Sequence, residues 1–464
     1  MRRTRHGGTT EQTGDGGRPA ARGLTRRRVL AGAAMPVALA ACGQTRTAQE
    51  PQPAPGERIT VEYVGFLTAE QSERMQVLFD RFAQEQRNVR VEHVPVPGAQ
   101  TEKRAKMQAL VAGGTPPAIV TQVSTEFPGY YVATGLIEEL DALMTADKMD
   151  RKALSAAALD ALNHRGKQYL IPYGASMELL AYNKELFDKQ GVKLPPKTWG
   201  DAGWTLEQFL QAGKALTKLG SGGGAPEQFG FSGTGYFWPG WPHLWGGDWA
   251  SQDLKKFTGT APQVVEAVQT GADFVWRQHI SAQPEENAVF GGKGFLSGKM
   301  AMTGMGTWNL LPWMKQAQFK WDVAPYFKVG SNPATTLMYP VGLGIGKGFK
   351  YRRQAWEFIK YVTQRPESNL EYAFVLGAVP ALVANAAPWR ALVAKEQPDL
   401  TAQVAIDVIQ KHGRATRFRG LTKFDEIDQQ VVLPALRKVW ANEMSAKAAL
   451  EQIAPQVQQL MDAG

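Results

Sequence analysis

Six aromatic side chains crowd into fourteen residues, and this density points to ligand binding. They are Tyr236, Phe237, Trp238, Trp241, Trp245 and Trp249. The prolines and glycines among them argue against a regular element, so we expect some of the rings on a loop. Flat aromatic faces suit the C–H faces of sugar rings, while carboxylates and amides bind the hydroxyls. The alternative is that the rings pack a domain core, and we expect about half of them to do only that.

The motifs of common enzyme classes do not occur in the sequence. It contains neither His-Glu-x-x-His nor Gly-x-Ser-x-Gly, and the glycine-rich segment 342–348 matches no phosphate-loop pattern. The histidines are scattered without ligand spacing, so we expect no metal and no cofactor. A surface glycoside hydrolase or lyase would need two carboxylates about 5–9 Å apart. The adjacent glutamates at 138–139 and 285–286 are expected to face solvent, so we predict that the protein is not an enzyme.

An apolar run of thirteen residues from Val29 to Ala41 precedes Cys42, the only cysteine. The run is too short to span a membrane, which takes about 20 residues, and it follows a basic region as in a secretory signal. Leu39-Ala40-Ala41-Cys42 resembles a bacterial lipobox, which implies removal of residues 1–41 and lipidation of Cys42. The segment 25–30, Thr-Arg-Arg-Arg-Val-Leu, is similar to a twin-arginine export signal, although the general secretion route also accepts basic leaders. We therefore expect a protein anchored by lipid outside the cytoplasm, at the cell surface or in the periplasm.

The basic character of the chain belongs mostly to this leader. The whole sequence has 52 basic and 43 acidic residues, a net charge of +9. Residues 1–41 hold eight arginines against two acidic residues, which leaves 44 basic and 41 acidic residues in the remainder, a net charge of +3. A nucleic-acid partner is therefore not expected.

The elements that position these residues begin after a tether at 42–56, which has no large apolar residue and three prolines. Residues 59–63 and 89–93 alternate as strands, and Thr68 and Gln71 have the spacing of a helix capping box. Apolar residues at 75, 78, 79 and 82 follow at helical spacing. A second helix is expected over about 101–111, before a short strand at 118–120. This alternation predicts an α/β fold with a mainly parallel sheet, whereas the last hundred residues are largely helical.

Ordered motifs along nearly the whole chain resemble those of the extracellular solute-binding proteins of carbohydrate ABC importers, the group that includes maltose-binding protein. The matching segments are 114–120 (GTPPAIV), 129–136 (GYYVATGL), 166–173 (GKQYLIPY), 182–187 (YNKELF), 195–199 (PPKTW), 295–302 (FLSGKMAM), 355–359 (AWEFI) and 377–381 (GAVPA). Ala118 departs from the aspartate that is usual in the first of them.

The resemblance implies a two-lobed periplasmic-binding-protein fold with a ligand cleft between the lobes. We predict the first lobe over 57–170 and 300–340, and the second lobe over 171–299 and 341–464. Trp308 and Glu126 match a sugar-stacking and an acidic ligand-binding position of the family, and Ser176 falls where the maltose-binding branch has a glutamate. The predicted ligand-binding residues are Tyr63, Phe66, Glu126, Tyr173, Ser176, Trp238, Trp241, Trp245 and Trp308.

The predicted function is capture of a sugar or oligosaccharide and its delivery to an ABC permease in the cytoplasmic membrane, by a protein expected to be a monomer. Ser176 argues against maltose itself. So does Leu67-Thr68, which falls where the maltose-binding branch has an acidic–basic pair. Receptors for another polar solute, a glycerol phosphodiester or a polyamine, remain alternatives. A phosphate-containing ligand would require arginines in the cleft, and a polyamine would require more carboxylates than Glu126 alone.

Overall fold

The computed structural model describes residues 51, 53–65, 67–96, 100–121, 128–220, 225–232 and 238–463. The predicted signal peptide, Cys42 and most of the tether lie outside these ranges, as do Phe66 and Glu126. Among the described residues, no helix combines the length and the apolar character that crossing a membrane requires.

The predicted β-α-β opening is confirmed. β1 (Ile59–Gly65) pairs in parallel with β2 (Val89–Pro95) and with β3 (Ile119–Thr121). Between β1 and β2 runs α1 (Ala69–Glu85), which Thr68 caps: its side chain accepts from the Gln71 amide while the Gln71 side chain accepts from the Thr68 amide. The residues that α1 buries are the four predicted apolar ones. α2 (Gln100–Ala112) then leads into β3.

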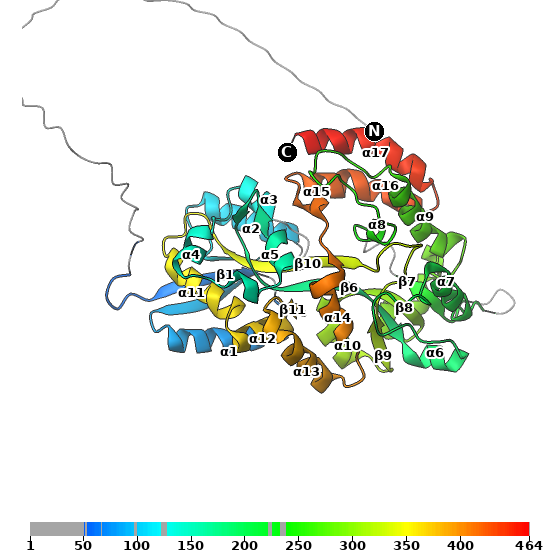
Figure 1. Cartoon of the computed structure of the whole chain (residues 1–464), viewed down its shortest axis with the longest axis horizontal. Coiled ribbons are helices and arrows are strands. Elements are labelled where there is room, and N and C mark those ends of the chain that lie inside the picture. The colour runs from blue at the N-terminus through cyan, green and yellow to red at the C-terminus, as the bar shows by residue number, and fades with distance from the viewer. Residues whose placement is uncertain are drawn as a thin grey trace, which may run out of the picture. The chain divides into compact units, whose positions relative to one another are not determined.

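Two long strands, β6 (Ile171–Asn183) and β10 (Thr336–Ile345), run through the middle of the sheet. They are antiparallel to one another, with Met338 opposite Met177 and Leu343 opposite Ile171. The sheet runs in the order β2-β1-β3-β10-β6-β8-β7, where β7 is Phe229–Ser232 and β8 is Met300–Gly306. β9 (Trp321–Ala324) also pairs with the far end of β6. Figure 1 shows β6 and β10 crossing between the elements around β1 and those around β8.

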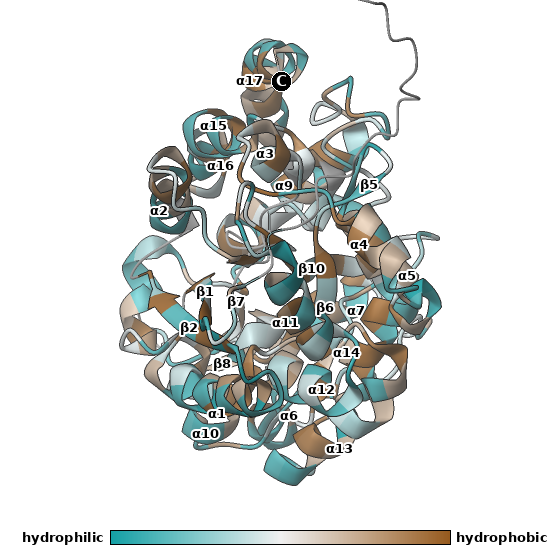
Figure 2. Cartoon of the chain, turned by 90° about the vertical axis from the view of Figure 1, so that its left-hand side faces the viewer, coloured by the Kyte–Doolittle hydropathy of each residue, from teal (hydrophilic) through white to brown (hydrophobic). Residues whose placement is uncertain are grey.

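Each end of the crossing strands enters a different hydrophobic core, and these cores define the two lobes. In the first lobe, residues 171 and 173 of β6 and 341–345 of β10 pack with β1, α1 and the helix α11 (Arg352–Thr363). In the second lobe, residues 175–181 of β6 and Met338 pack with β7, β8 and β9. Figure 2 shows apolar residues on the inner strands and hydrophilic ones on outward helices such as α1.

The cores divide the chain differently from the predicted lobe boundaries. Residues 300–338, expected in the first lobe, supply β8, β9 and side chains of the second-lobe cores. Residues 341–375, expected in the second lobe, supply the end of β10, α11 and most of α12 (Pro366–Val375), which pack in the first lobe. The physical reason is that β8 pairs with the second half of β6, so the chain does not return to the first lobe until β10.

The remaining elements cover these cores. They are α3 (Pro128–Ala133), α4 (Asp141–Ala146), α5 (Ala156–Ala161), β4 (Asn163–His164), β5 (Lys167–Gln168), α6 (Lys184–Gln190), α7 (Leu206–Ala215), α8 (Trp241–Leu244), α9 (Pro262–Trp276), α10 (Leu310–Gln316), β11 (Val379–Pro380), α13 (Ala386–Glu396), α14 (Gln403–Asp407), β12 (Gly413–Arg414), α15 (Phe424–Glu426), α16 (Leu433–Trp440) and α17 (Ala446–Asp462). Helices α9, α16 and α17 form a further core of the second lobe with the segment 418–432.

Candidate functional site

One face of the crossing strands carries a group of polar and aromatic side chains. Ser176 and Glu178 lie two residues apart on β6 and therefore point to the same side of the sheet. Tyr339 of β10 pairs opposite Ser176, and Gly306 of β8 pairs opposite Glu178. Because Gly306 has no side chain, β8 leaves space beside Glu178 on this face. We call Ser176, Glu178, Trp308 and Tyr339 the crossing site.

A buried carboxylate forms the polar centre of the crossing site. Glu178 is only 2% exposed, and its Oε1 accepts a hydrogen bond from the hydroxyl of Tyr339. A carboxylate is rarely buried this deeply unless hydrogen bonds compensate for the water that it loses. The backbone carbonyl of Glu178 accepts from Thr336 Oγ1 at 2.8 Å, which holds β6 and β10 together at this point.

Close backbone packing holds the ring of Trp308 against this group. The residue lies in the single 3₁₀ turn Thr307–Asn309, directly after β8, and Thr307 Oγ1 accepts from the amide of Met177 at 3.3 Å. A Cβ on Gly306 would lie 2.1 Å from the Trp308 ring, so the ring rests on the glycine backbone. Gly377, at φ +66°, approaches from the other side, where a Cβ would lie 2.6 Å from Trp308 Cα.

The two rings of the crossing site are neighbours. Trp308 and Tyr339 have centroids 5.7 Å apart and planes inclined at 61°, an edge-to-face contact. Trp308 is half-buried, whereas Ser176 and Tyr339 are buried. The arrangement thus combines a partly accessible aromatic ring with hydroxyl groups and a carboxylate.

A further hydroxyl lies close to Glu178. Tyr326 lines a small void together with Glu178, Gly240 and Trp241, and its hydroxyl is buried with no hydrogen-bond partner among the described residues. Burial, and after it the charge of Glu178, raises the pKa of Tyr326 well above its ordinary value. The phenol therefore stays protonated at neutral pH and can donate a hydrogen bond.

The three tryptophans predicted from the aromatic segment are packed in the second lobe. Trp238 meets Trp249 edge-to-face, with centroids 4.7 Å apart. Trp241 and Trp245 pack with Phe327 in another core of the same lobe. A turn at 238–240 and the short helix α8, which contains Pro242, bring these rings inward. Tyr236 and Phe237, which precede them, lie outside the described residues.

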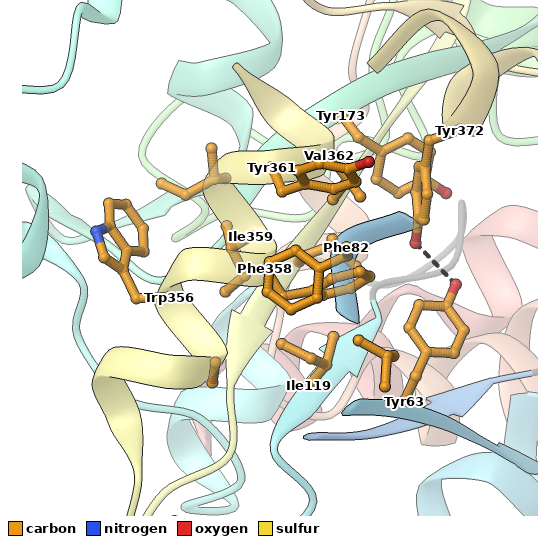
Figure 3. Close-up of a cluster of buried hydrophobic side chains, with 14 of the residues drawn as sticks. Tyr63, Phe82, Ile119, Tyr173, Trp356, Phe358, Ile359, Tyr361, Val362 and Tyr372 are labelled. Atoms are coloured by element: carbon orange, nitrogen blue, oxygen red, sulfur yellow. Dashed lines mark hydrogen bonds between the residues drawn. The ribbon is translucent and has the colours of Figure 1, made fainter. Parts of the chain in front are cut away.

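Tyr63 and Tyr173, predicted to line the cleft, belong to the core of the first lobe (Figure 3). The Tyr372 hydroxyl donates to that of Tyr63 at 2.8 Å, and the Tyr173 and Tyr372 rings are 4.7 Å apart. Burial raises the pKa of Tyr63 to about 12, despite the opposing bond from Tyr372. In this structure their contacts are with core side chains.

The sequence pointed to Ser176 and Trp308 but not to Glu178 or Tyr339. A local signal for Glu178 existed, because it is the single charged residue in the thirteen of β6. Tyr339 carried no such signal, because an aromatic residue in a strand is more often a packing residue.

A cavity of about 620 Å³ lies elsewhere between the lobes. Its lining includes His164 and Arg165 from the first lobe, Asp253 and Thr422 from the second, and Met338 of β10. Within the described ranges, no group of His, Cys, Asp or Glu side chains is arranged to hold a metal ion.

Known proteins match both the sequence and the fold. The maltotriose-binding protein of Pyrococcus abyssi is 22% identical over 280 residues, 59% of this chain and 56% of that protein, so the chain spans about half the length of this curated relative. A substrate-binding protein of Listeria monocytogenes, solved with cycloalternan, has a TM-score of 0.72 at 20% identity and covers 88% of this chain and 100% of its own. UgpB of Mycobacterium tuberculosis, solved with glycerophosphocholine, also has a TM-score of 0.72, at 19% identity, covering 87% and 98%.

These likenesses confirm the two-lobed periplasmic-binding-protein fold. The family model described as bacterial extracellular solute-binding protein matches residues 78–401, well over half of the chain. The chain therefore belongs to the bacterial extracellular solute-binding proteins, a family of non-catalytic receptors.

Proposed function

We propose that the protein captures a sugar or oligosaccharide between its lobes and delivers it to an ABC permease. The observation that carries this proposal is the crossing site, where the half-buried Trp308 ring lies beside Tyr339 and the buried Glu178. A sugar presents C–H groups on its ring faces and hydroxyls at its edges. An aromatic face with a nearby carboxylate and phenol is complementary to both.

The polar groups of the crossing site would orient the bound sugar, and the Trp308 ring would supply apolar contact area. The Glu178 carboxylate can accept from a ligand hydroxyl, and the Tyr326 phenol can donate to one. Ser176, next to Glu178 on the same face, adds a hydroxyl that donates or accepts. Phe66 and Glu126, which lie outside the described residues, remain proposed ligand contacts. Tyr63, Tyr173 and the three tryptophans would then support the site from the two cores.

Capture would proceed by closure of the lobes over the solute. The crossing strands β6 and β10 connect the two cores, so a bend within them changes the angle between the lobes. A ligand that contacts both lobes binds the closed state more tightly and shifts the population toward it. We further propose that Cys42 carries a lipid that holds the receptor at the outer side of the cytoplasmic membrane, within reach of its permease.

A glycerol phosphodiester is a second candidate ligand. The M. tuberculosis protein solved with glycerophosphocholine resembles this chain as closely in fold as the cycloalternan-bound protein does. A choline group is a cation that favours aromatic faces and a nearby carboxylate, and Trp308, Tyr339 and Glu178 could supply these.

A thermal-shift panel separates the candidates. Maltotriose, mannotriose, glycerophosphocholine and spermidine are each titrated against the full chain, and a ligand at a hundredfold its Kd stabilises by about 2.7 kcal/mol. We expect saturable stabilisation by at least one oligosaccharide and none by spermidine. Stabilisation by glycerophosphocholine alone would replace the sugar with the phosphodiester. If an oligosaccharide stabilises the Trp308→Ala variant as much as it stabilises the wild type, the crossing site is not where the sugar binds.

A further inference from the structure

A partly exposed ion pair joins the two lobes at a distance from the crossing strands. Arg104 of α2 belongs to the first lobe, where Met107 of the same helix packs into a core with β3. Its guanidinium forms a salt bridge with the carboxylate of Asp425, in α15. The Arg104 side chain is 11% exposed and that of Asp425 is 38% exposed. Asp425 belongs to the second lobe, because its neighbour Phe424 packs into the core of α9, α16 and α17.

The arginine is held in place by its own lobe. Its guanidinium carbon lies 5.2 Å from the centre of the Tyr130 ring of α3, a cation–π contact. The Tyr130 hydroxyl in turn accepts from Gln108 of α2 at 3.0 Å. Because contacts within one lobe restrict the Arg104 side chain, it loses little further freedom when Asp425 approaches.

A close backbone contact lies beside the ion pair. A Cβ placed on Gly129, at the start of α3, would lie 2.4 Å from the carbonyl oxygen of Gly420. Gly420 ends the 3₁₀ turn 417–420, whose Phe418 is buried in the same second-lobe core as Phe424. A side chain at 129 would therefore push the two lobes apart. Two independent features, one of charge and one of shape, join α2–α3 to the segment 417–426.

We propose that this contact is a latch that sets the balance between closed and open lobes, so that Arg104 and Asp425 tune ligand affinity without touching the ligand. Hinge opening at β6 and β10 would separate α2–α3 from the segment 417–426 and break the contact. Only the closed state then gains from it. The affinity consequence rests on the proposed capture function, but the conformational consequence does not.

The effect of the latch follows from its exposure. Because Asp425 is 38% exposed, the pair is worth at most the upper value for surface pairs, about 1 kcal/mol, which is about a fivefold change in the closed-to-open ratio. If the closed state is the binding-competent one, apparent Kd rises by the same factor as the closed fraction falls.

Small-angle scattering of the ligand-free full chain at low ionic strength tests the latch directly. Asp425→Asn and Gly129→Ala should each increase the radius of gyration, and the exchange of charges in the double variant Arg104→Asp, Asp425→Arg should restore it. The matched control is Glu451→Gln, which removes an exposed ion pair with Lys447 within α17. It should scatter like the wild type.

Folding and ligand binding are measured on the same variants. Asp425→Asn should keep the wild-type unfolding midpoint and bind maltotriose about fivefold more weakly. Identical scattering of Asp425→Asn and the wild type, with the fold intact, would overturn the latch. Absence of maltotriose binding by the wild type would count against the sugar proposal, and the scattering comparison would still decide the latch.

Discussion

Removal of the Trp308 ring is the sharpest test of the crossing site. If the ring stacks on a sugar, it covers roughly 60 Å² of apolar surface, worth about 1.5 kcal/mol at about 25 cal/mol per Å². The geometry of an aromatic contact adds about 0.5–1.5 kcal/mol. Trp308→Ala should therefore weaken binding by about 2–3 kcal/mol, which is about 30- to 150-fold in Kd.

The same substitution should cost less folding stability than the loss of a fully buried ring. A fully buried tryptophan replaced by alanine costs about 3–5 kcal/mol. Trp308 is half-buried, so we expect about 1–2 kcal/mol from chemical denaturation. Isothermal titration with the best oligosaccharide from the panel gives the affinity on the same preparation.

Two further variants test whether ligand affinity depends on the position of the Trp308 ring and on that ring in particular. Gly306→Ala keeps the ring but places a methyl group 2.1 Å from it, so the ring must move and affinity should fall. Trp313→Ala removes another half-buried tryptophan, which stacks on Phe295 in the second lobe at 5.0 Å, and affinity should not change. Unchanged affinity in Trp308→Ala, with a large loss of stability, would refute the reasoning and make Trp308 a packing residue.

Four other predictions concern the site, the fold and the anchor. Tyr339→Phe removes a donor to the buried Glu178, so the free energy of unfolding should fall by about 1–3 kcal/mol in chemical denaturation. Burial alone would raise the pKa of Asp147, but hydrogen bonds from Arg353, Lys360 and Trp356 outweigh it and lower the pKa to about 2. The ionised Asp147 therefore stabilises the fold above about pH 4, and this stabilisation is lost as pH falls toward 2. Asp147→Asn should flatten the acid side of a curve of unfolding free energy against pH. Saturating ligand should decrease the radius of gyration of the wild type, and an unchanged value would contradict capture by closure. Cys42→Ala should release the protein from the membrane fraction and abolish incorporation of labelled fatty acid, and retention of residues 1–41 in the cell would contradict this.

Local patterns predicted the local elements well. The alternation at 59–63, the Thr68 cap and the apolar spacing of α1 depend on neighbours a few residues away, and all three are present. The lobe boundaries depend on which strand β8 joins, and no local pattern encodes a pairing with residues more than a hundred positions earlier.

The crossing site was predictable in part for the same reason. Trp308 and Ser176 stood out because the segments around them resemble the family. Glu178 and Tyr339 come together only through the register of β6 against β10, which the sequence does not display. The aromatic segment shows the opposite outcome. Its prolines and glycines suggest a loop, but in the described part of the segment a turn and the short helix α8 bury Trp238, Trp241 and Trp245.

The alternation of the chain between the lobes constrains the order in which the protein can fold. The hydrogen bond between the hydroxyls of Tyr63 and Tyr372 joins residues 309 positions apart, and both rings belong to the first-lobe core. That core extends to Leu382 and cannot be completed until the chain has been synthesised to that point, and contacts of such long range form slowly. An export route that carries folded cargo would have to wait for this step, whereas a route for unfolded chains would have a long interval in which to engage the protein.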